Sequence, residues 1–280
     1  SKEEEVLSAQ VNGPTFSAIS LFSNCGAGDV GYRAAGFRFD VMAELDPRRL
    51  EVALLNHPGA VGVAGDLRKT WRKVVAAYRE RAGDRRPSLL CACPPCQGMS
   101  SARAGRGKEG DADAGSKDSR NLLVVVIAKV ARELQPKMIV VENVPAFFTR
   151  KVRDPKTKKP VTAARLLIRA LAQDYVAYPI VAELADYGVP QRRKRAFITF
   201  VRCDLRGLAM LTKGKRAPYP RPTHASDYGG KHVTLAQALR DFDLPALDAF
   251  SHEAATSTIG GGLHAVPVWD EQMYDMVAAI

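Results

Sequence analysis

Residues 17–28 read Ser-Ala-Ile-Ser-Leu-Phe-Ser-Asn-Cys-Gly-Ala-Gly, an apolar run followed at once by a turn of small residues. The run Ser17–Phe22 favours a buried strand, and Val30 to Ala35 favours a helix. Small residues between a strand and a helix let the backbone approach a ligand closely. The stretch therefore predicts the first strand, turn and helix of an α/β domain.

Strand-like and helix-like segments continue to alternate as far as Val201. Further strands are expected over residues 39–43, 61–64, 88–92, 137–141, 175–184 and 195–201. Helices are expected over residues 47–56, 71–81, 122–134 (with Ser119 as N-cap) and 162–171. This alternation predicts an α/β fold with a mostly parallel twisted sheet and helices on both faces. Ligands bind such sheets at the carboxyl ends of the strands.

Other segments lack this periodicity. Residues 98–117 are rich in Gly, Ala, Ser and charge, which favours a mobile loop, and residues 150–160 favour a surface loop rich in Lys, Arg and Pro. Beyond Val201 the sequence predicts irregular structure with one short helix near 234–240. We expect residues 1–15 to be an N-terminal extension, 16–205 a catalytic and cofactor-binding domain, and 206–280 an irregular C-terminal segment.

Composition limits the class of protein. A chain of 280 residues that is 46% hydrophobic can build one large α/β domain. No apolar run approaches the roughly 20 residues that span a bilayer. The polar start Ser1-Lys-Glu-Glu-Glu5 is not a signal peptide, so we expect a cytoplasmic protein without a targeting signal.

The net charge of +11 is concentrated in one segment, because residues 146–222 hold 18 Lys and Arg against 5 Asp and Glu. Localised positive charge indicates a polyanionic partner, usually nucleic acid, although a solvated basic face is the alternative. The five cysteines are odd in number and clustered, which argues against a disulfide framework. Cys91-x-Cys93-x-x-Cys96 allows a metal site, but no matching His/Cys group follows, so we expect no metal; Cys91 and Cys93 suit a buried strand.

Two acidic strand ends follow the first turn. Glu44 ends the second strand, where a carboxylate can bind ribose hydroxyls, and Asp66 follows the third, where it could hold an adenine edge. Together with the turn they indicate a nucleoside cofactor. These residues do not choose between NAD and S-adenosylmethionine.

Cys93-Pro-Pro-Cys96-Gln97-Gly98-Met-Ser100 carries the sharpest chemical signal. The prolines stiffen the chain before Cys96, which presents a thiol rigidly at a strand end. A thiolate is a strong nucleophile when its pKa is lowered or a base is near. The alternative is an ordinary buried thiol.

Two later segments carry polar groups that suit the same site. Glu142-Asn-Val144 ends the fifth strand, where Glu142 could bind a ring nitrogen and adjacent amine or simply face solvent. Gln191-Arg-Arg-Lys-Arg195 leads into a strand. Gln191, Arg193 and Arg195 share a face if the chain is extended, although basic runs alone are usually solvated.

Taken in order, these motifs resemble the cytosine-C5 DNA methyltransferase family. The matching motifs are Phe22-Ser-x-x-Gly26, Glu44-x-Asp46, Gly65-Asp-Leu67, Pro94-Pro-Cys-Gln97, Asp118-Ser-Arg-Asn-Leu-Leu123, Glu142-Asn-Val144 and Tyr187-Gly-Val-Pro-Gln-x-Arg-x-Arg195. They extend from about Phe16 to Val201. The resemblance implies a Rossmann-like S-adenosylmethionine-dependent methyltransferase fold and double-stranded DNA as partner.

The resemblance also implies roles for individual residues. Cys96 would attack C6 of a flipped cytosine, Glu142 would hold its N3/N4 edge, and Arg195 with Arg193 would contact the base carbonyl and a phosphate. Asn143 would brace the nucleophile loop, and residues 98–117 would close over the base. The implied DNA contacts are Gln97, Ser100, Asn143, Gln191 and Arg193. The implied S-adenosylmethionine contacts are Phe22, Ser23, Gly26, Glu44, Leu45, Asp66, Leu67, Pro95 and Leu123.

The sequence departs from the family pattern in two ways. Asn24 and Ala27 stand where the family usually has glycine, and Asn tolerates positive φ better than most residues. The target recognition domain and closing Gly-Asn-x-Val motif are not found before Ile280. We therefore expect either a second subunit that carries target recognition or a catalytic fragment, from a restriction–modification or related defence system.

Three other functions would account for parts of the sequence. The family's tRNA-methylating branch would keep the chemistry and change the substrate to RNA. A non-catalytic nucleic-acid-binding subunit would leave Cys96, Glu142 and Arg195 without a role. An NAD-dependent oxidoreductase would leave Pro95-Cys96 and Glu142-Asn143 unexplained.

Overall fold

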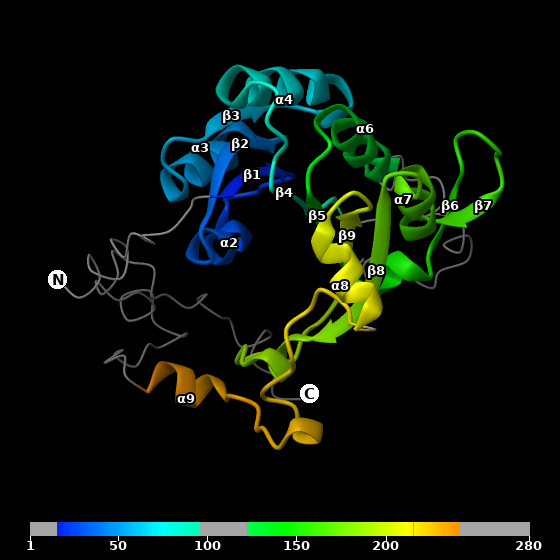
Figure 1. Ribbon diagram of the computed structural model, residues 1–280. Coiled ribbons are helices and arrows are strands. Elements are labelled where there is room, and N and C mark those ends of the chain that lie inside the picture. The colour runs from blue at the N-terminus through cyan, green and yellow to red at the C-terminus, as the bar shows by residue number, and fades with distance from the viewer. Residues whose placement is uncertain (1–15, 96–121, 215, 241–280) are drawn as a thin grey trace, which may run out of the picture.

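The structure is a computed structural model that describes residues 16–95, 122–214 and 216–240. Its main sheet has seven strands in the order β3-β2-β1-β4-β5-β9-β8 (Figure 1). The strands are β1 (Phe16–Leu21), β2 (Phe37–Glu44), β3 (Val61–Ala64), β4 (Leu89–Ala92), β5 (Met138–Asn143), β8 (Tyr175–Glu183) and β9 (Lys194–Arg202). Neighbours from β3 to β5 are parallel, whereas β9 is antiparallel to both β5 and β8. The expected α/β class and mostly parallel sheet are confirmed.

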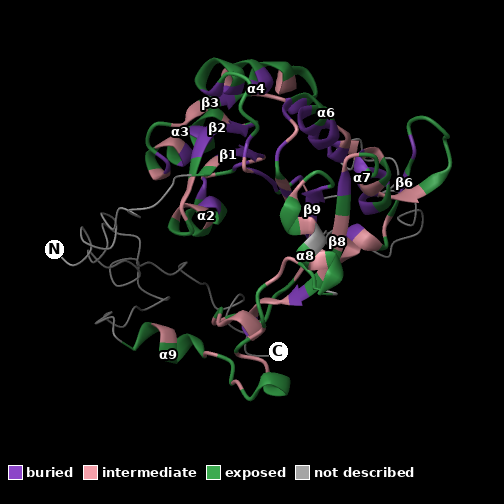
Figure 2. Ribbon diagram, viewed as in Figure 1, coloured by how far each residue is buried: buried purple, intermediate pink, exposed green. Residues whose placement is uncertain are grey.

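Helices cover both faces of the sheet. The helices are α2 (Val30–Ala34), α3 (Pro47–Asn56), α4 (Leu67–Ala82), α6 (Val124–Leu134), α7 (Ala163–Leu171), α8 (Arg206–Lys213) and α9 (Leu235–Leu239). In β1, Ile19 and Leu21 join the larger core against α4, α6 and α7, while Ala18 packs into a smaller core against α3. This alternation follows from the two-residue period of a strand. Buried positions accordingly line both sides of the sheet (Figure 2).

Local capping explains where two helices begin. Asp46 accepts a hydrogen bond from the Arg48 amide at the start of α3, and Pro47 occupies the first turn. Asp66 accepts from the Arg68 amide in the same way, so α4 begins at Leu67 and not at the expected residue 71. α6 begins at Val124 with Leu123 at its N-cap position. Ser119, the expected cap, lies outside the described residues.

Two expectations about irregular structure are wrong. Residues 150–160, expected to be a surface loop, contribute to a two-stranded hairpin of β6 (Lys151–Arg153) and β7 (Pro160–Thr162). Residues 206–240, expected to be irregular apart from one helix, contain α8 as well as α9. No helix in the described part of the chain is both long and apolar enough to cross a membrane.

The topology gathers polar residues at one edge of the sheet. The parallel strands β1, β2, β3, β4 and β5 all end at this edge, which we call the carboxyl edge. Because β9 runs antiparallel to β5, it begins at the same edge, and Asn143 pairs with Ala196 in the register. Residues that follow β5 and residues that open β9 therefore meet there.

Candidate active site

Glu142 is the centre of a polar cluster at the carboxyl edge. The Nε of Arg195 lies 2.7 Å from Glu142 Oε1, and the Cys93 thiol donates to Oε2 at 2.6 Å. The Arg195 and Glu142 side chains are 17% and 29% exposed, so the ion pair is sheltered but reachable. Each carboxylate oxygen keeps further lone-pair capacity, so Glu142 can still accept from a ligand.

Asn143 connects this cluster to the chain that leads toward Cys96. Its Nδ2 donates to the Pro94 carbonyl at 2.9 Å, and its Oδ1 accepts from the Val144 amide at 2.9 Å. The side chain is 2% exposed, so its bond to the Pro94 carbonyl is shielded from water. The end of β5 therefore holds the Pro94–Pro95 segment in place.

The segment before β9 is fixed through its backbone. The Arg193 amide donates to Glu183 Oε1 at 2.5 Å, and the Arg193 carbonyl accepts from the Leu184 amide at 2.9 Å. The side chains of Gln191 and Arg193 are exposed. The structure thus brings Arg195 to Glu142, whereas the side chains of Gln191 and Arg193 form no ion pair or hydrogen bond with the other described residues.

The turn after β1 is built on several residues with positive φ. Phe22 has φ 60°, Asn24 has φ 51° and Gly26 has φ 74°. A Cβ on Gly26 would lie 2.9 Å from His57 Cδ2, so this position needs glycine. Asn24 adopts the left-handed conformation that Asn tolerates. The Ser23 hydroxyl donates to the Ala43 carbonyl at 3.1 Å and thereby joins the turn to β2.

Glu44 organises the neighbouring strand end. Its Oε2 accepts from the Asn24 amide at 2.9 Å and its Oε1 accepts from the Asp46 amide at 3.2 Å. Leu45, directly after it, is 68% exposed. A buried carboxylate beside an exposed apolar side chain offers both polar and apolar contact to a nucleoside.

Other expected cofactor residues have structural partners. The Asp66 carboxylate binds Arg68 at 2.6 Å, and hydrogen bonding to this guanidinium lowers the pKa of Asp66. Leu67 and Leu123 are buried in the larger core, and Pro95 is half-buried. Cys96, Gln97 and Ser100 lie outside the described residues, as does the expected loop over 98–117.

Comparison with known proteins identifies the family to which the chain belongs. A model for C-5 cytosine-specific DNA methylases matches residues 16–248.

The chain belongs to this methylase family.

Relatives include the Type II methyltransferase M.AquIA of Picosynechococcus sp., which is 31% identical over 78% of this chain and 80% of its own length. M1.HgaI of Avibacterium volantium is 32% identical over 64% of this chain and 48% of its own length. M.NgoPII of Neisseria gonorrhoeae is 30% identical over 70% and 51%. The chain thus spans most of the first relative and about half of the other two.

A solved structure shares the fold. A DNA modification methyltransferase encoded within a prophage of E. coli matches with a TM-score of 0.58 and 24% identity. The match covers 84% of this chain and 57% of the other. The family identification and the Rossmann-like fold expected from the motifs are both confirmed.

Sequence reasoning missed two polar contacts in this methylase domain. Cys93 was expected to be a buried strand thiol, but its side chain is exposed and contacts Glu142 because β4 ends one residue before it. Asp29 is 7% exposed and accepts from Ser20 at 2.7 Å and from Cys91 at 3.1 Å. Burial raises the pKa of Asp29 and also that of the Cys91 thiol. The register of β4 against β5 creates the first contact, and the register of β1 against β4 creates the second. Sequence spacing does not give either register.

No metal site accompanies these groups in the part of the chain that the structure describes, where no cluster of three or more His, Cys, Asp or Glu could hold an ion.

Proposed function

We propose that this chain is the catalytic part of an S-adenosylmethionine-dependent enzyme that methylates C5 of cytosine in double-stranded DNA. The observation that carries the proposal is the Glu142 carboxylate, held by Arg195 at the carboxyl edge and joined through Asn143 to the chain that enters Cys96. Membership of the methylase family supports the same reaction.

The cofactor would bind along the ends of β1, β2 and β3. Glu44 suits the ribose hydroxyls, because its oxygens retain acceptor capacity after the two backbone bonds. Phe22 and the exposed Leu45 would pack on the adenosine. Asp66 would meet the adenine amine with the oxygen capacity that Arg68 leaves free. When bound, S-adenosylmethionine supplies the methyl group that C5 takes up.

The residues of this chain would activate the cytosine. Glu142 would take up a proton from solvent before the attack. The Cys96 thiolate would then form a bond to C6 while Glu142 donates that proton to N3, so the C5–C6 double bond opens and C5 becomes nucleophilic. Arg195 fixes the Glu142 carboxyl in place from the side of β9. After methylation a base removes the C5 proton, the Cys96–C6 bond breaks, and the double bond re-forms as Glu142 recovers its proton. The target must leave the stack for this attack.

Residues near the site would contact DNA. Gln191 and Arg193 are exposed just before β9, and Gln97 and Ser100 complete the set of proposed direct contacts. Asn143 is buried and bonded to the Pro94 carbonyl, so we propose that it acts on the DNA site through that segment. Since the relatives are Type II methyltransferases, we place the enzyme in a restriction–modification system.

Trapping on duplex DNA that contains 5-fluorocytosine tests the reaction, because fluorine at C5 blocks release of the enzyme. Wild-type protein with S-adenosylmethionine is expected to form a covalent adduct, and Cys96→Ala is expected to form none. Cys203→Ala, which removes an exposed thiol outside the site, is the matched control. An adduct of equal yield with Cys96→Ala would refute the mechanism.

A further inference from the structure

The hairpin between β5 and α7 is an ordered element that the proposed chemistry does not use. We call residues 150–162 the basic hairpin. Val152 pairs with Val161 across its two strands, and Val152 is 1% exposed in the larger core. One buried valine thus anchors an otherwise polar hairpin to the methylase domain.

Asp154 shapes the turn of the basic hairpin. Its Oδ1 accepts from the Lys156 and Thr157 amides at 2.8 and 3.3 Å, and its Oδ2 binds the Arg169 guanidinium of α7 at 2.5 Å. Hydrogen bonding to Arg169 lowers the pKa of Asp154 to about 2. The only carboxylate of residues 150–162 is therefore ionised and occupied internally.

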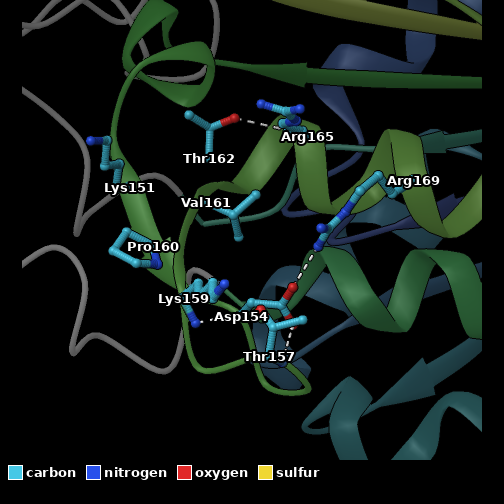
Figure 3. A pocket seen from close by; sticks show the side chains of 9 residues that line it. All are labelled: Lys151, Asp154, Thr157, Lys159, Pro160, Val161, Thr162, Arg165 and Arg169. Atoms are coloured by element: carbon cyan, nitrogen blue, oxygen red, sulfur yellow. Dashed lines mark hydrogen bonds and ion pairs between the residues drawn. The ribbon is translucent and has the colours of Figure 1, made fainter.

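The remaining charges on the basic hairpin are positive. Its exposed cations are Lys151, Arg153, Lys156, Lys158 and Lys159, and Arg165 is exposed at the start of α7. Among the described residues, no ion pair engages Lys151, Lys159 or Arg165. These three side chains line a cavity of about 320 Å³ between the hairpin and α7 (Figure 3). Thr157 and Thr162 line the same cavity.

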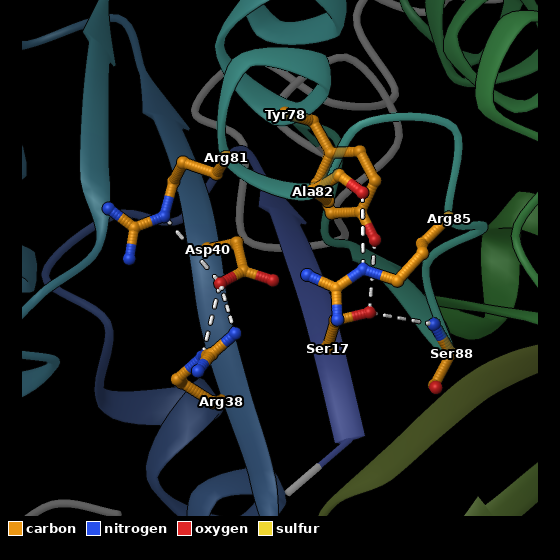
Figure 4. Close-up of polar contacts among 8 residues, drawn as sticks. All are labelled: Ser17, Arg38, Asp40, Tyr78, Arg81, Ala82, Arg85 and Ser88. Atoms are coloured by element: carbon orange, nitrogen blue, oxygen red, sulfur yellow. Dashed lines mark hydrogen bonds and ion pairs between the residues drawn. The ribbon is translucent and has the colours of Figure 1, made fainter.

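In a second basic cavity, of about 460 Å³, several arginines are paired with carboxylates, in contrast to the cations of the first cavity. It lies where β1 and β2 begin, at the opposite edge of the sheet. There Arg38 binds the buried Asp40 at 3.0 Å, and Arg81 lies 3.6 Å from the same carboxylate (Figure 4). Arg86 pairs with Asp204 at 2.6 Å. Those arginines stabilise the fold, whereas Lys151, Lys159 and Arg165 form no ion pair with any residue that the structure describes.

The chain topology starts the basic hairpin from the carboxyl edge. The chain leaves β5 at Asn143 and reaches Lys151 through one short turn, Pro145–Phe148. Since β8 runs in the same direction as β5, the chain must return to the opposite edge before β8 begins. α7 makes that return, so its first residues and the adjoining hairpin start from the edge that carries Glu142 and Arg195.

We propose that the basic hairpin clamps the DNA backbone beside the base-flipping site, with Lys151, Lys159 and Arg165 contacting phosphates. The inference rests on the proposed function, since it names a further surface for the same DNA. Phosphate contacts of this kind fix the register of a duplex and carry no sequence information. The clamp would hold the DNA helix while the target cytosine rotates out, which suits a hairpin that is anchored in the core through Val152.

The salt dependence of DNA binding tests the clamp. We compare Lys151→Ala/Lys159→Ala/Arg165→Ala with Lys73→Ala/Arg79→Ala/Lys129→Ala, which removes the same charges from exposed positions of α4 and α6. Fluorescence anisotropy of a labelled duplex is measured over a series of salt concentrations. Loss of three phosphate contacts lowers the slope of log affinity against log salt by about 2.7, since each contributes about 0.9. The control is expected to keep the wild-type slope.

Several results overturn the clamp. It is refuted if both triple variants lower the slope equally, or if the hairpin variant changes binding to tRNA and not to duplex DNA. Lys159→Glu, a single change at an exposed site, replaces the triple variant if that variant unfolds, and is expected to weaken binding to every duplex alike. Wild-type DNA binding without any 5-fluorocytosine adduct would instead count against the proposed reaction, so the two failures are distinguishable.

Discussion

Asn143→Ala is expected to slow attack on cytosine without unfolding the protein. The substitution removes the bonds of 2.9 Å to the Pro94 carbonyl and from the Val144 amide. Asn143 is 2% exposed and its bond to the Pro94 carbonyl is buried, so the substitution leaves that carbonyl without its donor. An unsatisfied buried group costs about 1–3 kcal/mol. If that energy disorganises the segment that enters Cys96, the rate of attack falls by about 10- to 100-fold.

The measurement is the rate of adduct formation on 5-fluorocytosine duplex at saturating S-adenosylmethionine. Urea unfolding of the same samples reports the free energy of unfolding separately. Asn143→Asp is the matched variant, because it keeps an acceptor for the Val144 amide and loses only the donor to Pro94. It is expected to be at least as slow as Asn143→Ala. A folded Asn143→Ala protein that forms adduct at the wild-type rate would show that Asn143 does not position the nucleophile.

Three further substitutions have defined outcomes. Burial raises the pKa of Asp29, so the folded state holds its proton more tightly than the unfolded state; the free energy of unfolding is expected to fall as pH rises from 3.8 through the folded pKa. Asp29→Asn removes that fall, as urea unfolding at a series of pH values will show. Gly26→Ala forces a side chain to φ 74° and against His57, so thermal unfolding should reveal a loss of about 1–3 kcal/mol and titration a weaker affinity for S-adenosylmethionine. Arg195→Lys loses the Nε contact to Glu142 and should slow adduct formation by about tenfold, with DNA affinity less affected; an unchanged rate would remove Arg195 from the site.

Much of the fold follows from the sequence because its strands are apolar and its helix starts are capped. The helix over 47–56 and the strand over 61–64 have the expected bounds, since Asp46 and Pro47 define the helix start. The basic hairpin was missed for a physical reason. Its only apolar strand residues are Val152 and Val161, so alternation is too short to recognise, and side-chain bonds of Asp154 form its turn.

The candidate site divides in the same way. The spacing of motifs places Glu142, Asn143 and Arg195 at strand ends, and the sheet order then brings Glu142 and Arg195 together. The contact of Cys93 with Glu142 depends on the register of β4 against β5, which no local pattern specifies. The internal bond from Asp66 to Arg68 likewise depends on a side-chain rotamer.

Because β9 runs antiparallel to β5, the ion pair between Glu142 and Arg195 can form only when these two strands pair in the correct register. The two residues come from strands separated by the whole hairpin–α7–β8 excursion, and they meet only when Asn143 stands opposite Ala196. A slip of one residue would turn Arg195 to the other face of the sheet and leave Glu142 without its cation. Insertions at the tip of the basic hairpin should therefore leave this ion pair intact. A single residue inserted between Lys194 and Phe197 should instead give a domain that folds compactly but lacks the ion pair and is inactive.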